Sequence, residues 1–119
     1  MNDVAPILLC EDLVVGHAGQ PVMSDINIRL PAGKIIAIVG PSGCGKSTLM
    51  RVLGGLDEPM SGRSELLGTD LVHATAIERE SVLRRSGFLF QGAALFSSLT
   101  LRENVELPLR EFLPIPSQE

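Results

Sequence analysis

The stretch "GPSGCGKST", residues 40–48, decides how this sequence folds and what it can bind. It holds three glycines and one lysine, and it ends in two adjacent hydroxyl side chains. The apolar run "KIIAIVG" (34–40) leads into it, and "KSTLMRVLGGL" (46–56) follows with helical spacing of its apolar residues. Because glycine has no Cβ, the main chain can bend sharply there and a ligand can approach it closely. The sequence therefore predicts a bare turn between a strand and a helix.

The stretch fits a known phosphate-binding pattern. Gly40, Gly45, Lys46 and Ser47 match G-x-x-x-x-G-K-[ST], the P-loop or Walker A motif, which requires a strand before it and a helix after it. In such a loop the main-chain N–H groups and the helix N-terminus attract phosphate. We expect Lys46 to reach the β- and γ-phosphates of a nucleotide, the Ser47 hydroxyl to bind Mg²⁺, and Thr48 to contact the α-phosphate side.

The expected nucleotide site extends over the whole loop. Cys44 occupies a variable position of the motif, and it is either a small residue that fits the turn or a thiol made reactive by the helix N-terminus. The alternative to a phosphate site is a glycine-rich connection without a ligand. The residues expected to bind the nucleotide are Gly40, Pro41, Ser42, Gly43, Cys44, Gly45, Lys46, Ser47 and Thr48.

The composition excludes several other classes of protein. The 119 residues are 45% hydrophobic and 20% charged, an ordinary balance for a globular domain. A net charge of −4 and the absence of Trp and Tyr disfavour a nucleic-acid partner. Cys10 and Cys44 do not form a disulfide framework, which favours a reducing compartment. No stretch approaches the roughly 18 apolar residues of a membrane span, so we expect a soluble chain that can dock on a membrane protein.

The hydrophobic pattern predicts an alternation of strands and helices. The run 22–30 alternates in the period of a half-buried strand, whereas 34–40 is apolar on both faces and suits a covered parallel sheet. Thr100 and Glu103 form a capping box at the start of the last helix, which we expect to stop near Pro108. The expected elements are strands at 6–15, 22–30, 34–40 and 86–91, a short strand and turn at 63–71, and helices at 46–56, 75–85 and from 100.

Gln91 is a second candidate for the site. It directly follows the apolar run "GFLF" (87–90), so it is expected where a strand ends. A glutamine at the carboxyl edge of a sheet can reach the phosphates and the metal of a neighbouring P-loop. A solvated loop residue is the alternative, and the spacing alone leaves both open.

The stretches "GPSGCGKSTLMRVLGGLDEPMSG" (40–62) and "FLFQGAALFSSLTLRENV" (88–105) resemble the N-terminal half of an ABC transporter ATPase, and the resemblance covers nearly the whole chain. The family's G-L-x-x-P-x-x-G pattern is matched by Gly55, Leu56, Pro59 and Gly62, and its Q-loop glutamine by Gln91. Within the family, residues 90–111 are most similar to the Mla-type and related MCE-system ATPases, which move phospholipids across the Gram-negative envelope.

This resemblance implies an α/β P-loop NTPase fold, with a mixed sheet, an antiparallel β subdomain, a P-loop helix and an incomplete core over residues 1–119. It implies ATP and Mg²⁺ as cofactors, Lys46 and Gln91 as catalytic residues, and Ser47 and Gln91 as metal-binding residues. It also implies a membrane permease subunit and a second ATPase subunit as partners, at the cytoplasmic face of the inner membrane. Energised transport, of phospholipid or another hydrophobic substrate, is the expected function.

The sequence departs from the family pattern in two ways. His17 falls where the family usually places an aromatic residue that stacks on adenine, and it is either such a residue or a turn residue. The family's signature motif, Walker B strand and switch histidine do not occur in residues 1–119, so we interpret the chain as a partial nucleotide-binding domain that hydrolyses little ATP by itself. A non-catalytic nucleotide-binding or interaction module is the alternative function, and an unrelated P-loop kinase fits less well.

Overall fold

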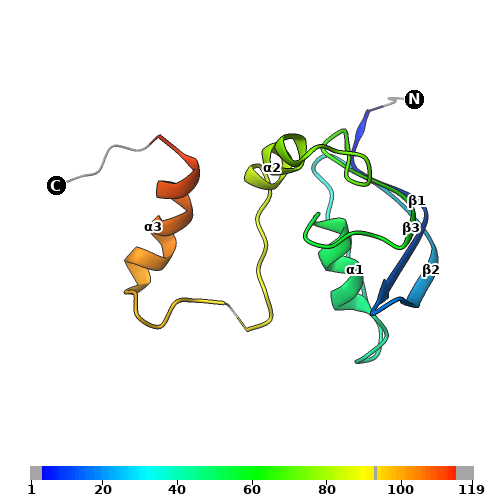
Figure 1. Cartoon of the computed structure of the whole chain (residues 1–119), viewed down its shortest axis with the longest axis horizontal. Helices are drawn as coiled ribbons and strands as arrows, with labels where there is room; N and C mark the ends of the chain where they lie inside the picture. The colour runs from blue at the N-terminus through cyan, green and yellow to red at the C-terminus, as the bar shows by residue number, and fades with distance from the viewer. Residues whose placement is uncertain (1–3, 93, 115–119) are drawn as a thin grey trace. The chain divides into compact units, whose positions relative to one another are not determined.

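The computed structural model describes residues 4–92 and 94–114. They belong to two compact units, Met1–Ser86 and Gly87–Glu119, which are described separately. The first unit is built on a four-stranded antiparallel sheet with strand order β2-β1-β3-β4. Figure 1 labels β1, β2 and β3 of this sheet. Its elements are β1 (Pro6–His17), β2 (Gln20–Pro31), α1 (Lys46–Leu53), β3 (Ser61–Leu66), β4 (Thr69–Asp70) and α2 (Ala76–Arg84).

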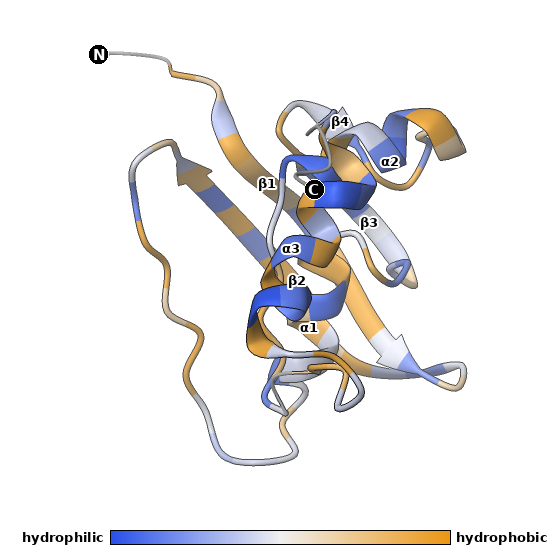
Figure 2. Cartoon of the chain, turned by 90° about the vertical axis from the view of Figure 1, so that its left-hand side faces the viewer, coloured by the Kyte–Doolittle hydropathy of each residue, from blue (hydrophilic) through white to orange (hydrophobic). Residues whose placement is uncertain are grey.

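Strands β1 and β2 form a hairpin joined by the two-residue turn Ala18-Gly19. Both turn residues have positive φ, 51° and 77°, as in the turns whose twist matches that of an antiparallel pair. Along β2 polar and apolar residues alternate (Figure 2), and Ile26 and Ile28 pack against the core. The half-buried strand predicted at 22–30 is therefore confirmed, with a longer span.

The core lies between α1 and the sheet. The helical spacing predicted for 46–56 is confirmed, because the apolar face of α1 is buried, and the helix ends at Leu53, directly before Gly54 and Gly55. Burial also raises the pKa of the Cys10 thiol, whose sulfur lies 3.8 Å from the hydroxyl oxygen of Ser64. The buried residues of this cluster are Leu8, Cys10, Leu13, Val15, Leu49, Val52 and Leu53.

Helix α2 is tied to the rest of its unit by Arg79. The guanidinium donates to the main-chain oxygen of Gly55 at 3.1 Å and to that of Leu71 at 2.5 Å. Gly55 comes directly after Gly54, the C-cap of α1, so the cation also lies at the negative end of that helix. On α2 itself Val82 is buried, but Ile77 is 82% exposed. The hydrogen bonds of Arg79 therefore add to a small apolar contact in holding α2 to the rest of its unit.

Two predicted strands are not formed. Residues 34–40 and 86–91 have no regular secondary structure, and no strand within the described ranges pairs with either of them. Ile35 is 98% exposed and Val39 87% exposed. A strand that is apolar on both faces needs hydrogen-bonded neighbours and a cover on each side. The antiparallel sheet offers neither, which is why the prediction fails at these segments.

The second unit contains one helix, α3 (Leu101–Phe112). Thr100 and Glu103 form the predicted capping box, with bonds of 2.8 and 3.1 Å. The side-chain amide of Asn104 holds the preceding loop: its oxygen accepts from the Phe96 amide at 2.8 Å, and its nitrogen donates to the Phe96 and Thr100 carbonyls. These bonds fix the direction in which the chain enters the helix.

The end predicted for this helix is wrong, because α3 continues through Pro108. Proline lacks the N–H that would bond the carbonyl of Asn104, which normally costs a helix about 3 kcal/mol. One ion pair crosses the proline: Glu106 accepts from Arg110 at 2.9 Å, and it also accepts from Arg102 at 3.3 Å in the turn before Pro108. In the described part of the chain, no helix is both long and apolar enough to cross a bilayer.

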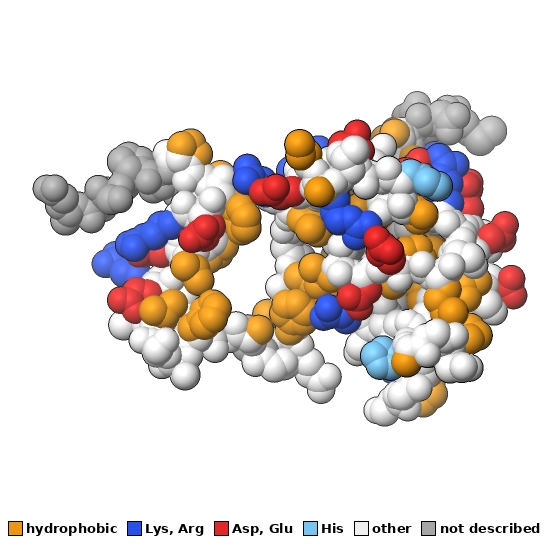
Figure 3. Space-filling model, viewed as in Figure 1, with side chains coloured by type: hydrophobic (Ala, Val, Ile, Leu, Met, Phe, Trp, Pro, Cys, Tyr) orange, Lys and Arg blue, Asp and Glu red, His pale blue; other side chains and the backbone are white. Residues whose placement is uncertain are grey.

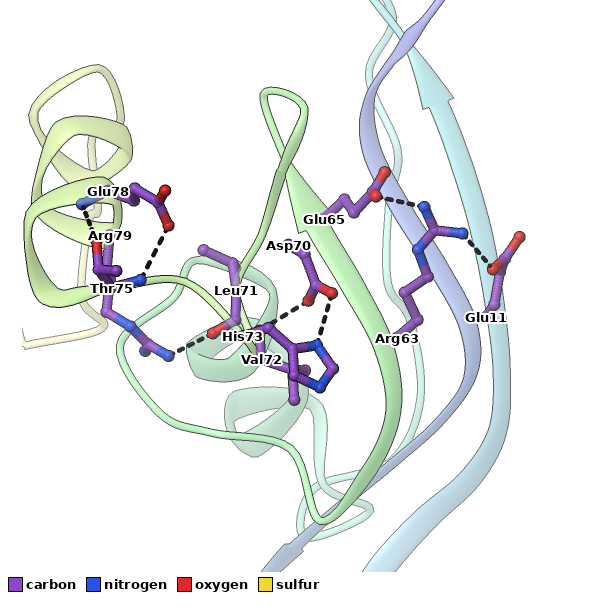
Figure 4. A network of polar contacts seen from close by, with 10 residues as sticks. All are labelled: Glu11, Arg63, Glu65, Asp70, Leu71, Val72, His73, Thr75, Glu78 and Arg79. Carbon is purple, nitrogen blue, oxygen red and sulfur yellow. Dashed lines mark hydrogen bonds and ion pairs between the residues drawn. The ribbon is translucent and has the colours of Figure 1, made fainter.

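A polar network lies on the surface beside β4 (Figure 4). The Asp70 carboxylate accepts from the Val72 amide at 2.9 Å and contacts Nδ1 of His73 at 2.8 Å. The hydrogen bond with His73 is the largest cause that lowers the pKa of Asp70, and the Val72 amide acts in the same direction. On the neighbouring strands Arg63 pairs with Glu11 at 3.0 Å. The contacts of Asp70 order the turn between β4 and α2, whereas the Arg63–Glu11 pair links β3 to β1.

The lowered pKa of Asp70 predicts a loss of stability in acid. Its value in the unfolded chain is near 3.9, so the ionised carboxylate stabilises the fold above about pH 4, and this contribution is lost as the pH falls through the lower folded-state pKa. The free energy of unfolding, measured by urea denaturation from about pH 6 to pH 2, should fall more steeply for the wild type than for Asp70→Asn. Asp25→Asn, an exposed control on β2, should keep the wild-type slope; equal slopes for all three would contradict the prediction.

Candidate phosphate-binding site

The main chain of the loop 40–45 takes a shape that requires glycine. Gly43 has φ 80° and Gly45 has φ 101°, both in the left-handed region that side chains disfavour. A Cβ at Gly45 would also come within 2.4 Å of Cγ1 of Val22, near the start of β2. Gly45 is the N-cap of α1 and has no side chain to cap it. The loop therefore turns directly into the helix against the wall of the sheet.

The start of α1 offers unpaired main-chain donors. The first helical bond runs from the Leu49 amide to the Gly45 carbonyl at 2.9 Å. Within the described residues, no acceptor is found for the amides of Lys46, Ser47 and Thr48. The first N–H groups of a helix carry partial positive charge and attract an anion. Ser47 is exposed beside them, so its hydroxyl can be reached by a ligand or a metal.

Lys46 brings a positive charge to the same place. Its ammonium donates to the main-chain oxygens of Gly40 at 2.6 Å and of Pro41 at 2.7 Å. Its Nζ also lies 3.6 Å from Sγ of Cys44, whose own amide donates to the Pro41 carbonyl at 3.3 Å. The contact with the Cys44 sulfur was not predicted from the sequence, and the motif gives no signal for it because this position is variable. The ammonium is thus folded back on the loop.

The loop residues together fit a polyphosphate with Mg²⁺. Residues 40–48 include no acidic side chain that would repel the ligand. The glycines leave the main chain bare, and nothing lies within 4 Å of a Cβ placed on Gly43. Three free amides, one ammonium and the Ser47 hydroxyl would be available to a ligand that supplies oxygen atoms, and a hydroxyl oxygen is a ligand that Mg²⁺ accepts. In the described ranges, no three side chains of His, Cys, Asp or Glu gather as a metal site.

His17 ends β1 and lies opposite Gln20 across the hairpin turn. It is exposed, and its charge is the smallest of the causes that lower the pKa of Asp57; the hydrogen bond from Arg51 is the largest. Val22, against which Gly45 packs, is only two residues beyond Gln20. His17 and Val22, the residue that the loop contacts, therefore lie at the same end of the β1–β2 hairpin. Its stacking on a base stays a prediction.

Gln91 lies in the second unit, in an exposed turn. Its expected contact with phosphate and Mg²⁺ therefore stays a prediction. His73, which the sequence analysis did not select, is a surface residue bonded to Asp70. Of the expected site residues, the structure brings together those of the loop 40–48 and the start of α1.

Comparisons with known proteins agree on one family. The sequence profile of the family described as "ABC transporter" matches residues 23–119. The sulfate/thiosulfate import ATP-binding protein CysA of Synechocystis sp. is 41% identical over 99 residues, which are 82% of this chain and 26% of that protein. The intermembrane phospholipid transport system ATP-binding protein MlaF of Escherichia coli is 34% identical over 116 residues, 98% of this chain and 43% of that protein.

A solved structure shows the same fold. The dimeric ATP-binding cassette MJ0796, bound to ADP and Pi, superimposes with a TM-score of 0.81 at 28% identity, over 93% of this chain and 50% of that one. The expected fold class is confirmed by this similarity. The chain spans from about a quarter to half of the length of the proteins compared with it.

The contact between Gly45 and Val22 leads to a prediction about stability. Gly45→Ala combines a left-handed backbone with a steric clash, whereas Gly19→Ala at φ 77° has nothing within 4 Å of the new Cβ. The strain alone should cost Gly19→Ala about 1–2 kcal/mol in the free energy of unfolding. Gly45→Ala should lose about 1–3 kcal/mol more, because the clash must be relieved. Urea denaturation of both variants measures the difference, and equal losses would show that Val22 does not confine the loop.

Proposed function

Since this chain belongs to the ABC transporter family, we propose that it is the nucleotide-binding part of an ATPase that energises transport across a membrane. The observation that carries the proposal is the loop 40–48, where three unpaired amides and the Lys46 ammonium converge at the start of α1. The sulfate and phospholipid proteins compared above are named as ATP-binding components of transport systems. The geometry of the loop supports the same role here.

The residues of the loop would each hold a different part of Mg-ATP. The amides of 46–48 would bind phosphate oxygens, and Lys46 would exchange the loop carbonyls for the β- and γ-phosphates. Ser47 would bind Mg²⁺ and Thr48 would contact the α-phosphate side. Mg²⁺ would neutralise the charge that develops when the terminal phosphate is transferred. The chain's own part is to position the phosphates and to stabilise their negative charge.

Gln91 is the second residue proposed to act in catalysis. Its carboxamide could accept a hydrogen bond from the attacking water, and it could bind Mg²⁺ through its oxygen. This proposal rests on the position of Gln91 after the apolar run 87–90 and on the match to the family's Q-loop. In this proposal Lys46 contributes most to binding of the nucleotide, and Lys46 and Gln91 both contribute to its hydrolysis.

The proposed partners are a membrane permease and a second ATPase subunit, at the cytoplasmic face of the inner membrane. Support for a permease contact comes from apolar side chains exposed on α3 and on the loop before it (Figure 3). Phe96 is 58% exposed although both of its main-chain groups are held by Asn104. A crosslink from a cysteine at position 97 or 98 to the permease would test this contact.

The proposed substrate is a phospholipid or another hydrophobic molecule. The relative named for phospholipid transport is similar to nearly the whole chain, which supports this choice. A relative named for sulfate and thiosulfate import is also similar, so the family alone does not select the substrate. Transport measured with the complete system, with labelled phospholipid and labelled sulfate in parallel, would separate the two.

We predict that Lys46→Ala weakens Mg-ATP binding about 10- to 100-fold, because it removes a charged donor to phosphate. A fluorescent ATP analogue with Mg²⁺, titrated into the full chain, measures the dissociation constant. Lys34→Ala, the other lysine of the sequence, is the matched control and should leave affinity within about twofold. Equal affinity of Lys46→Ala and the wild type would exclude the loop as the phosphate site.

Gln91→Ala should retain Mg-ATP affinity but lower phosphate release by about 100-fold in the full protein with its partners. Wild-type protein that binds Mg-ATP without releasing phosphate under these conditions would favour the non-catalytic module instead.

The role of His17 predicts a difference between a nucleotide and a bare polyphosphate. If the imidazole stacks on adenine, His17→Ala should weaken Mg-ATP binding about fivefold and leave Mg-tripolyphosphate binding unchanged. His17→Phe should bind Mg-ATP at least as tightly as the wild type, since a larger ring stacks better. Competition titrations against the fluorescent analogue measure both ligands. Unchanged Mg-ATP affinity in His17→Ala would identify His17 as a turn residue only.

A further inference from the structure

The ammonium of Lys46 is surrounded by acceptors that belong to its own loop. An ammonium group has three N–H donors. The carbonyls of Gly40 and Pro41 lie 2.6 and 2.7 Å from Nζ, and Sγ of Cys44 lies 3.6 Å away in a partly buried position. The loop therefore offers one acceptor for each donor, and any phosphate has to compete with all three.

The sulfur lies close to the main chain of its own loop. The amide of Cys44 donates to the Pro41 carbonyl at 3.3 Å, which fixes the main chain that carries the thiol. A Cβ at Gly40 would lie only 2.9 Å from Sγ. The thiol thus occupies the space that a side chain at residue 40 would need. Its distance from the ammonium follows from the packing of the loop.

We propose that Cys44 is a positioning residue of this loop: its sulfur helps to hold the Lys46 ammonium against the loop carbonyls, and residue 44 thereby sets how readily that ammonium is released to a phosphate. The proposal rests on the proposed function of the loop as a nucleotide site. It concerns the side chain of Cys44, leaves the expected nucleotide contact to the main chain of this residue, and involves no covalent chemistry.

The direction of the effect follows from the competition. A ligand shifts an equilibrium only by the difference in its interaction with the two states. Contacts that the ammonium makes only in the resting loop oppose phosphate binding, because they must be broken first. Sulfur is a weak acceptor, so its contribution is small, although partial burial strengthens it. Removing the sulfur should therefore increase the affinity for Mg-ATP.

The experiment compares Cys44→Ala and Cys44→Ser with Ser24→Ala in the full chain. Ser24 is exposed on β2, outside the loop, so its substitution is the control. Without nucleotide, the ¹⁵N signal of the Lys46 ammonium is recorded by NMR, together with its hydrogen-exchange rate. We expect Cys44→Ala to shift this signal and to speed exchange, and Ser24→Ala to leave both unchanged. With Mg-ATP, Cys44→Ala should bind about threefold more tightly than the wild type.

Cys44→Ser keeps an acceptor with shorter reach, so its ammonium signal and affinity should lie between those of the wild type and Cys44→Ala. It also carries the test if thermal unfolding shows that Cys44→Ala does not fold. Weaker Mg-ATP binding in a folded Cys44→Ala, or an ammonium signal unchanged in both Cys44 variants, would overturn the inference. A shifted ammonium signal without Mg-ATP binding in any protein would support the hold on Lys46 and contradict the proposed function alone.

Discussion

The site depends on one constraint, which is the left-handed main chain at Gly45 pressed against Val22. Because glycine has no side chain, the loop can pass close to the sheet at this point, and it enters α1 without a capping side chain. The position of α1 is fixed in turn by its buried apolar face, where Leu49 and Val52 pack in the core. With the helix held by its apolar face and the loop confined by glycine, the first amides of α1 remain without partners. The partial positive charge that these amides present to a ligand therefore depends on the packing of the loop and of α1 as well as on the residues of the motif.

Local patterns allowed much of this unit to be predicted. The alternation around Ile26 and Ile28 depends on one buried face, and the helical spacing at Leu49 and Val52 depends on one buried stripe. Both signals arise from contacts that the described residues themselves make. The motif likewise identified Lys46 and its glycines, since the requirement for a bare loop is visible in residue types. The contact of Cys44 with Lys46 was not predictable, because any small side chain satisfies the pattern at that position.

The predictions that the structure contradicts each have a physical reason. Ile35 and Val39 lie in a run that reads as a strand, yet a strand exists only when another strand accepts its hydrogen bonds. The strand propensity of these side chains does not provide the neighbouring strand that must form hydrogen bonds with them. At Pro108 the error has the opposite sign, because a local helix breaker does not end the helix, which has a capping box at its start and the Glu106–Arg110 ion pair across the proline. The expected role of Gln91 stays a prediction: the apolar run before it suggests its position at the end of a strand, but local sequence does not show which groups its side chain would contact.

The pairing of the antiparallel sheet has a consequence for how the protein is made. Every ladder bond of β1 to β4 joins residues between Pro6 and Asp70. As a nascent chain leaves the ribosome, β1 and β2 can therefore close their hairpin at once, and β3 can join β1 as soon as residue 66 has emerged. The sheet and the phosphate loop, which contacts β2 through Gly45 and Val22, can then assemble before the residues after Asp70 have emerged. Later segments are added to a scaffold that already exists.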